Sequence, residues 1–137
     1  MASGNGHERV DERSDAREQA LILLYECEQR SEHLTSVVNQ HAAIYVGLTK
    51  ELADGVEQGR ADIDALIASH SKGWTLERMP AIDRTILRIA TFELVSRVDT
   101  PVAVIIDEAV ELAKRFSTDD SGRFVNGVLA AVARSVR

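Results

Sequence analysis

The sequence is 137 residues long, the length of one ordinary domain and enough to bury a core without disulfides or metal ions. Apolar residues make up 45% of it but aromatic residues only 4%, so we expect an aliphatic, alanine-rich core of helices rather than sheets. The 16 basic and 22 acidic residues give a net charge of −6. This balance excludes nucleic-acid binding by bulk electrostatics and leaves room only for a local site.

Targeting signals are missing from the sequence as given. No run approaches the roughly 18 apolar residues of a membrane span, and residues 1–15 lack the apolar stretch of a signal peptide. We therefore expect a cytoplasmic protein that does not bind membranes. Residues 1–10 are polar and glycine-containing, which predicts a flexible N-terminal arm before a helical domain at 11–137. The single cysteine, Cys27, falls on an apolar helical face and should pack as a small hydrophobic residue.

The first predicted helix begins with a cap at Asp11 or Ser14 and ends near Arg30. Arg13 and Arg17 lie one turn apart on its rim, where both could face phosphate groups. The alternative is that they pair with neighbouring acids on a solvated face. The predicted core stripe of this helix is Ala16, Ala20, Leu23, Leu24 and Cys27.

The middle of the chain predicts further helices. Apolar spacing between Val37 and Val56 indicates helical packing that is interrupted near Gly47 and ends near Gly55 and Gly59. Another helical stretch follows at Asp62–Ser69.

A connection at His70–Gly73 predicts the boundary between an N-terminal bundle of about residues 11–72 and a C-terminal bundle of about residues 73–137. Residues 80–96 are apolar on more than one side, so we expect an inner helix there, with Leu94 and Ala90 buried.

The stretch 101–129 predicts a helical hairpin. Thr100 should cap its first helix, with Pro101 at the first helical position, and Phe116 should close the apolar face that includes Leu112. Residues 117–122 should form the turn. Gly127 then lies inside the second helix, where a glycine costs roughly 1 kcal/mol, which predicts close approach of another backbone.

Catalytic chemistry finds no support in the residue pattern. The sequence contains neither Glu-x-x-His nor His-x-x-x-His, and one cysteine with scattered histidines gives no metal-ligand spacing. There is no phosphate-binding loop or dinucleotide glycine motif. We therefore expect a protein that is not an enzyme and that has no catalytic residue, cofactor or metal site.

Three segments together carry a family resemblance: AREQALILLYE (16–26), MPAIDRTILRIATFEL (79–94) and DEAVELAKRFSTDDSGRFVNGVL (107–129). They closely resemble the NusB family of bacterial transcription antitermination factors, and the likeness extends over most of residues 13–132. The resemblance implies an all-α fold of two packed small helical bundles. It also implies binding of a boxA-type RNA together with the ribosomal protein NusE, in the context of the transcription elongation complex.

The family motifs also imply which residues contact RNA. In the first helix the matching positions are Arg13, Arg17 and Tyr25, although Ser14 stands where the family motif is usually basic. In the second helix of the hairpin Asp120 and Phe124 match closely, and Arg123 is included as a basic position beside them. Phe124 has two possible roles, stacking on a base or packing in the hairpin core.

Two functions remain open at this point. The first is an RNA-binding adaptor in ribosomal RNA antitermination that works as a heterodimer with NusE. The second is a protein–protein interaction module with little intrinsic RNA affinity, which the acids around Arg13 would permit. An exposed apolar helix face could equally serve a homodimer.

Overall fold

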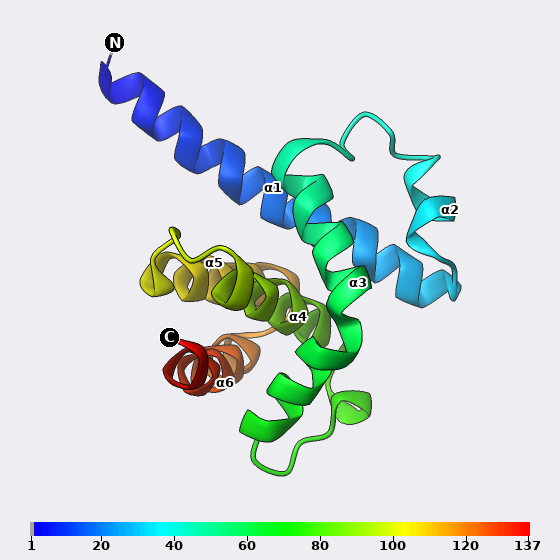
Figure 1. Ribbon diagram of the computed structural model, residues 1–137, viewed down its shortest axis with the longest axis vertical. Coiled ribbons are helices and arrows are strands. Elements are labelled where there is room, and N and C mark those ends of the chain that lie inside the picture. The colour runs from blue at the N-terminus through cyan, green and yellow to red at the C-terminus, as the bar shows by residue number, and fades with distance from the viewer. Residues whose placement is uncertain (1) are drawn as a thin grey trace. The chain divides into compact units, whose positions relative to one another are not determined.

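The computed structural model describes residues 2–137, with side chains from residue 12 onward. This part of the chain is all-α, as expected, and contains no strand. Its elements are α1 (Ala2–Arg30), α2 (Leu34–Val38), α3 (Gly47–His70), the 3-10 helix η1 (Leu76–Arg78), α4 (Ala81–Ser96), α5 (Val102–Phe116) and α6 (Asp119–Val136) (Figure 1). Within residues 2–137, no helix combines the length and apolar character that crossing a membrane requires.

The chain divides into two compact units, Met1–Asp54 and Gly55–Arg137. The division falls inside α3, whereas the sequence predicted it at the connection that follows this helix. That connection exists, because α3 ends at His70 and an irregular segment leads from there to η1.

In the first unit, α1 packs against α2. α1 begins at Ala2, so the predicted start of the first helix at Asp11 or Ser14 is wrong. No proline interrupts the stretch before Ser14, and extending an established helix costs little per residue. The Asp11 side chain lies outside the described residues, and flexibility of residues 1–10 stays a prediction. The predicted core stripe is confirmed as buried: Ala16, Ala20, Leu23, Leu24 and Cys27.

A polar cluster fixes the start of α3. The Tyr45 hydroxyl donates to Asp54, and Lys50 Nζ donates to the same carboxylate at 2.7 Å. Burial, together with the Asp54 carboxylate, raises the pKa of Tyr45 to about 12. Burial also acts to raise the pKa of Asp54, but the hydrogen bonds from Lys50 and Tyr45 outweigh it, so that pKa is lowered.

The glycines of α3 have different roles. Gly47 has φ +54° at the predicted interruption, where a left-handed backbone favours glycine. The helix then continues through Gly55 and Gly59, so the predicted end at these residues is wrong. A Cβ on Gly55 would collide with the ring of Phe92 from α4, so the glycine makes room for that ring within the second unit.

In the second unit, α4 packs against both α5 and α6, and α5 packs against α6 (Figure 1). The expectation of an inner helix is confirmed, because most of α4 is buried, including Leu94 and Ala90. Leu112 of α5 is also buried as expected. Glu111 is exposed, but Glu108 is only partly so.

The hairpin of α5 and α6 is present, with corrections at its ends. Pro101 occupies the N-cap position and no side chain caps α5, so the prediction of a Thr100 cap is wrong. The turn consists of Ser117 and Thr118 alone, because α6 already begins at Asp119. Phe116 is 39% exposed, not buried, since it is the last residue of α5 and the chain leaves the helix there; α6 begins three residues later.

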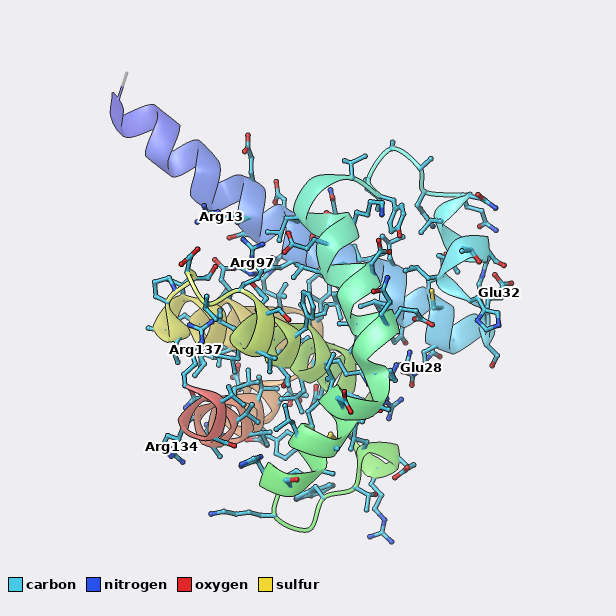
Figure 2. The ribbon with its side chains drawn as sticks, in the orientation of Figure 1. Arg13, Glu28, Glu32, Arg97, Arg134 and Arg137 are labelled. Atoms are coloured by element: carbon cyan, nitrogen blue, oxygen red, sulfur yellow. The ribbon has the colours of Figure 1, made fainter. Side chains whose placement is uncertain are left out.

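Arg137 fastens the end of α6 to the connection between α4 and α5 (Figure 2). Its guanidinium donates to the carbonyl oxygens of Leu94 at 2.9 Å and Thr100 at 2.7 Å. It also donates to the carbonyls of Glu93 and Arg97. These bonds tie the last residue of the chain to carbonyls at the end of α4 and in the connection to α5.

Candidate nucleic-acid interface

A hydrogen-bond network holds the turn between α5 and α6. Thr118 is the N-cap of α6, and its Oγ1 accepts from the backbone N–H of Ser121 at 3.0 Å. Ser121 Oγ in turn donates to Asp83 Oδ2 of α4 at 2.8 Å. The Ser117 hydroxyl lies 2.9 Å from Ser121 Oγ. The first turn of α6 is therefore fixed against α4.

An aromatic pair stands beside this turn. The rings of Trp74 and Phe124 meet edge to face, with their centroids 6.1 Å apart and an interplanar angle of 63°. Trp74 is 54% exposed, whereas Phe124 is half-buried. Phe124 thus lies neither in the hairpin core nor free on the surface, and the pair offers an aromatic surface to solvent.

The loop before η1 presents Trp74 in a defined position. Lys72 and Gly73 both adopt positive φ, 45° and 89°. Ser71 Oγ donates to the Trp74 carbonyl at 2.7 Å, and the Trp74 N–H donates to the Ser71 carbonyl at 3.1 Å. Because a left-handed residue that is not glycine is unfavourable, Lys72 indicates a loop held in one conformation by its surroundings.

Arg84 of α4 anchors the segment that follows Trp74. Its guanidinium donates to the carbonyls of Leu76 at 2.8 Å and Met79 at 3.1 Å, which secures η1 to α4. Burial and the neighbouring Arg88 lower the pKa of Arg84. Arg88 itself makes two bonds to Asp64 of α3, at 2.8 and 3.0 Å.

A pocket of about 200 Å³ opens between the aromatic pair and the turn. Asp83 is one of the residues that line it; 3% of its surface is exposed, and its Oδ1 has no hydrogen-bond partner within the described residues. A buried carboxylate oxygen without a donor is costly, so it suits a donor supplied by a ligand or partner. The pocket is lined by Trp74, Met79, Pro80, Asp83, Thr118, Asp120, Ser121 and Phe124.

The structure brings together three of the six predicted site residues. Asp120 and Arg123 are exposed on the first turns of α6 and form an ion pair, and Phe124 follows directly. This ion pair neutralises part of the positive charge that Arg123 was expected to offer.

The other three predicted residues belong to α1, in the first unit. Arg13 is exposed and Tyr25 is half-buried, but Arg17 is only 3% exposed. The expectation that both arginines lie on a solvated rim is therefore wrong for Arg17. Helical spacing explains the difference, since Ala20 and Leu21 follow Arg17 by three and four residues and are both buried.

Trp74 and Asp83 were not predicted as site residues. The signal for Trp74 was available, because a lone tryptophan directly after a glycine in a loop is an unusual place for a large apolar side chain. The sequence carried no such signal for Asp83, because only the fold shows that its carboxylate is buried beside Ser121.

Comparisons with known proteins agree with this architecture. The model of the NusB family matches residues 14–134. A transcription antitermination protein NusB from Saccharopolyspora erythraea is 46% identical over 127 residues, covering 88% of this chain and 86% of the relative.

Solved structures give the same result. NusB of T. maritima superposes with a TM-score of 0.79 at 36% identity, covering 89% of this chain and 90% of the other. A chain from a structure of antitermination factors NusB and NusE in complex with double-stranded RNA has a TM-score of 0.77 at 26% identity, covering 90% of this chain and 96% of its own length. The chain belongs to the NusB family.

Proposed function

We propose that this protein is an RNA-binding transcription antitermination factor without catalytic activity. It acts on ribosomal RNA transcripts by binding a boxA-type element together with the ribosomal protein NusE, as part of the transcription elongation complex. The names of its relatives support antitermination, and the complex of similar structure contains NusE and RNA.

One observation carries the RNA proposal: the Trp74–Phe124 pair, with its indole exposed, beside Arg123 on a turn fixed to α4. Single-stranded RNA is recognised chiefly by stacking of splayed bases on aromatic rings, with nearby cations holding the phosphates. Aromatic residues are rare in this chain, yet two of them meet at this surface. The predicted contacts of Arg13 and Tyr25 would extend the same function to the first unit.

The proposed partner, NusE, supplies positive charge that this chain lacks. At a net charge of −6, the protein attracts a basic ribosomal protein, and the pair then presents a mixed surface to RNA. Asp83 Oδ1 gives the partner a specific target, since a buried oxygen without a donor favours an arginine or lysine that enters the pocket. RNA and NusE should therefore bind cooperatively.

A second candidate function is a protein–protein module with little RNA affinity of its own. The burial of Arg17 favours it, because α1 then offers fewer cations than the family motif implies. The acids around Arg13 point the same way. Sedimentation of the isolated chain tests whether this module forms a homodimer.

A titration of labelled boxA-type RNA, with and without NusE, tests the proposal. We expect NusE to form a stable complex and to tighten RNA binding. Replacing Arg13 with alanine should lower the slope of log K against log salt by about 0.7, the value of one phosphate contact on a single strand. Arg30→Ala is the matched control, since Arg30 is exposed at the other end of α1. RNA affinity that is absent or indifferent to Arg13, with NusE still bound, would favour the protein–protein module.

A further inference from the structure

A second hollow of about 340 Å³ lies on the other side of the aromatic pair, along α6. We call it the α6 groove. The loop of residues 70–74 forms one wall, and successive turns of α6 form the rest. Its lining residues are His70, Ser71, Lys72, Trp74, Arg123, Phe124, Gly127, Val128, Ala131 and Arg134.

Gly127 in the groove has no structural reason to be glycine. It is exposed in the middle of α6, its φ is not positive, and a Cβ built on it meets nothing within 4 Å. The predicted approach of another backbone of this chain is therefore wrong. By contrast, a Cβ on Gly122 would lie 3.0 Å from Lys114 Cγ. A helical glycine that costs stability and is not needed for packing leaves room for something outside the chain.

The charge of the α6 groove indicates which class of ligand fits it. Lys72, Arg123 and Arg134 all line it, whereas no aspartate or glutamate does. Figure 2 shows Arg134 extending from the last turns of α6. Within the described residues Lys72 and Arg134 have no ion pair, while Arg123 pairs with Asp120 at the mouth. In a chain of net charge −6, this local excess of cations favours a polyanion.

The length of the groove and its aromatic wall indicate which kind of polyanion fits it. Arg123 and Arg134 are eleven residues apart on one helix, about 16 Å along its axis, which is a span of a few nucleotides. Trp74 exposes its indole next to the cations. A row of phosphate-binding cations beside an exposed aromatic face suits an unpaired strand better than a duplex, whose bases are stacked inside.

We propose that the α6 groove binds a single-stranded RNA segment, with a base stacked on Trp74, phosphates at Lys72 and Arg134, and the sugar–phosphate backbone passing over Gly127. This inference rests on the proposed function. It adds a binding segment beyond Asp120, Arg123 and Phe124, and three contact residues that were not predicted from the sequence: Lys72, Trp74 and Arg134. A polyanion is favoured over an apolar protein segment because Lys72, Arg123 and Arg134 line the groove together with its aromatic rings, and no carboxylate among the described residues lines it.

The first test uses the intrinsic fluorescence of Trp74, the only tryptophan in the chain. Adding boxA-type RNA should quench the emission in parallel with binding measured by anisotropy of the labelled RNA. Trp74→Ala should weaken binding about 5- to 100-fold, the equivalent of one lost stacking contact, and Trp74→Phe should retain most of the affinity. Bound RNA with unchanged tryptophan emission would overturn the proposal.

The second test compares Gly127→Glu with Gly127→Gln. The two side chains have nearly the same shape and helix propensity, and neither meets a neighbour at Cβ, so both variants should fold alike. The negative charge should weaken RNA binding about fivefold more than the amide at low salt, and the difference should shrink as salt is added. Lys72→Ala and Arg134→Ala should each lower the salt slope by about 0.7.

The outcomes separate this inference from the proposed function. If wild-type protein with NusE binds no boxA-type RNA, the proposed function fails, and the groove proposal fails with it. If RNA binds and responds to Arg13→Ala but not to the variants of Trp74 and Gly127, only the groove proposal fails. If the Gly127 variants instead impair NusE binding in the absence of RNA, the groove is a protein contact and the proposal is again wrong.

Discussion

The same substitution, glycine to alanine, should have opposite effects at two positions of the second unit. Alanine is about 1 kcal/mol more favourable than glycine in a helix interior. At Gly127 nothing opposes this gain, because a Cβ there meets no atom within 4 Å, so Gly127→Ala should raise the free energy of unfolding by about 1 kcal/mol. At Gly55 the new methyl group collides with the Phe92 ring, and overpacking costs typically 1–3 kcal/mol. Gly55→Ala should therefore leave the protein unchanged or up to about 2 kcal/mol less stable.

Urea unfolding followed by circular dichroism measures both values. The two glycines lie in the same compact unit, so both variants report on the same part of the structure. For a chain of this length, the Gly127 variant should melt about 4 °C higher than wild type. The same variant should bind RNA more weakly, since its methyl group enters the α6 groove. A Gly127→Ala protein that is less stable than wild type would refute the reasoning, as would a Gly55→Ala protein that gains the full helix propensity.

Two further predictions concern burial and ionisation. Leu94→Ala should cost about 2–5 kcal/mol in urea unfolding because Leu94 is 1% exposed, while Phe116→Ala should cost less than about 1 kcal/mol because its ring is 39% exposed. The pKa of Tyr45 is about 12 in the folded protein and 10.0 without its surroundings, so the folded state holds this proton more tightly. Stability should fall as the pH rises from about 10 to 12, and Tyr45→Phe should reduce that fall; equal pH dependence in both proteins would contradict the assignment.

The helices of the second unit could be predicted closely because their apolar spacing is regular. Residues 80–96 differ from α4 by one residue, and the hairpin was found with its correct partners. The ends of elements were harder to predict, since caps and turns depend on neighbours. Phe116 continues the apolar stripe of α5, but it is the last residue of that helix and is 39% exposed.

Single glycines could not be interpreted from the sequence. Gly55 looks like a helix end and is instead a packing site for Phe92, whereas Gly127 looks like a packing site and has empty space around it. The sequence shows that a glycine carries a cost, but only the neighbours in the fold show what offsets it.

The candidate binding surface could be predicted only where its residues are close together in the chain. Asp120, Arg123 and Phe124 share two turns of α6, so one motif indicates all three. Trp74 lies 50 positions earlier, and only the packed structure places its ring against Phe124. Arg17 shows the reverse error, because its charge suggested a surface role that its position between buried residues contradicts.

The net charge of the whole chain is likewise a poor guide to what binds at this candidate surface. The total of −6 counts every acid equally, but Asp120 is paired with Arg123, and Asp83 is buried, with its Oδ2 accepting from Ser121. Lys72 and Arg134 come from separate segments and line a groove without any carboxylate. At physiological salt a ligand senses charges only within about 8 Å, so these local cations, rather than the acidic total, determine what binds. An acidic chain can therefore bind RNA along one groove and attract a basic partner to the adjacent pocket of Asp83, which is the combination that cooperative binding with NusE requires.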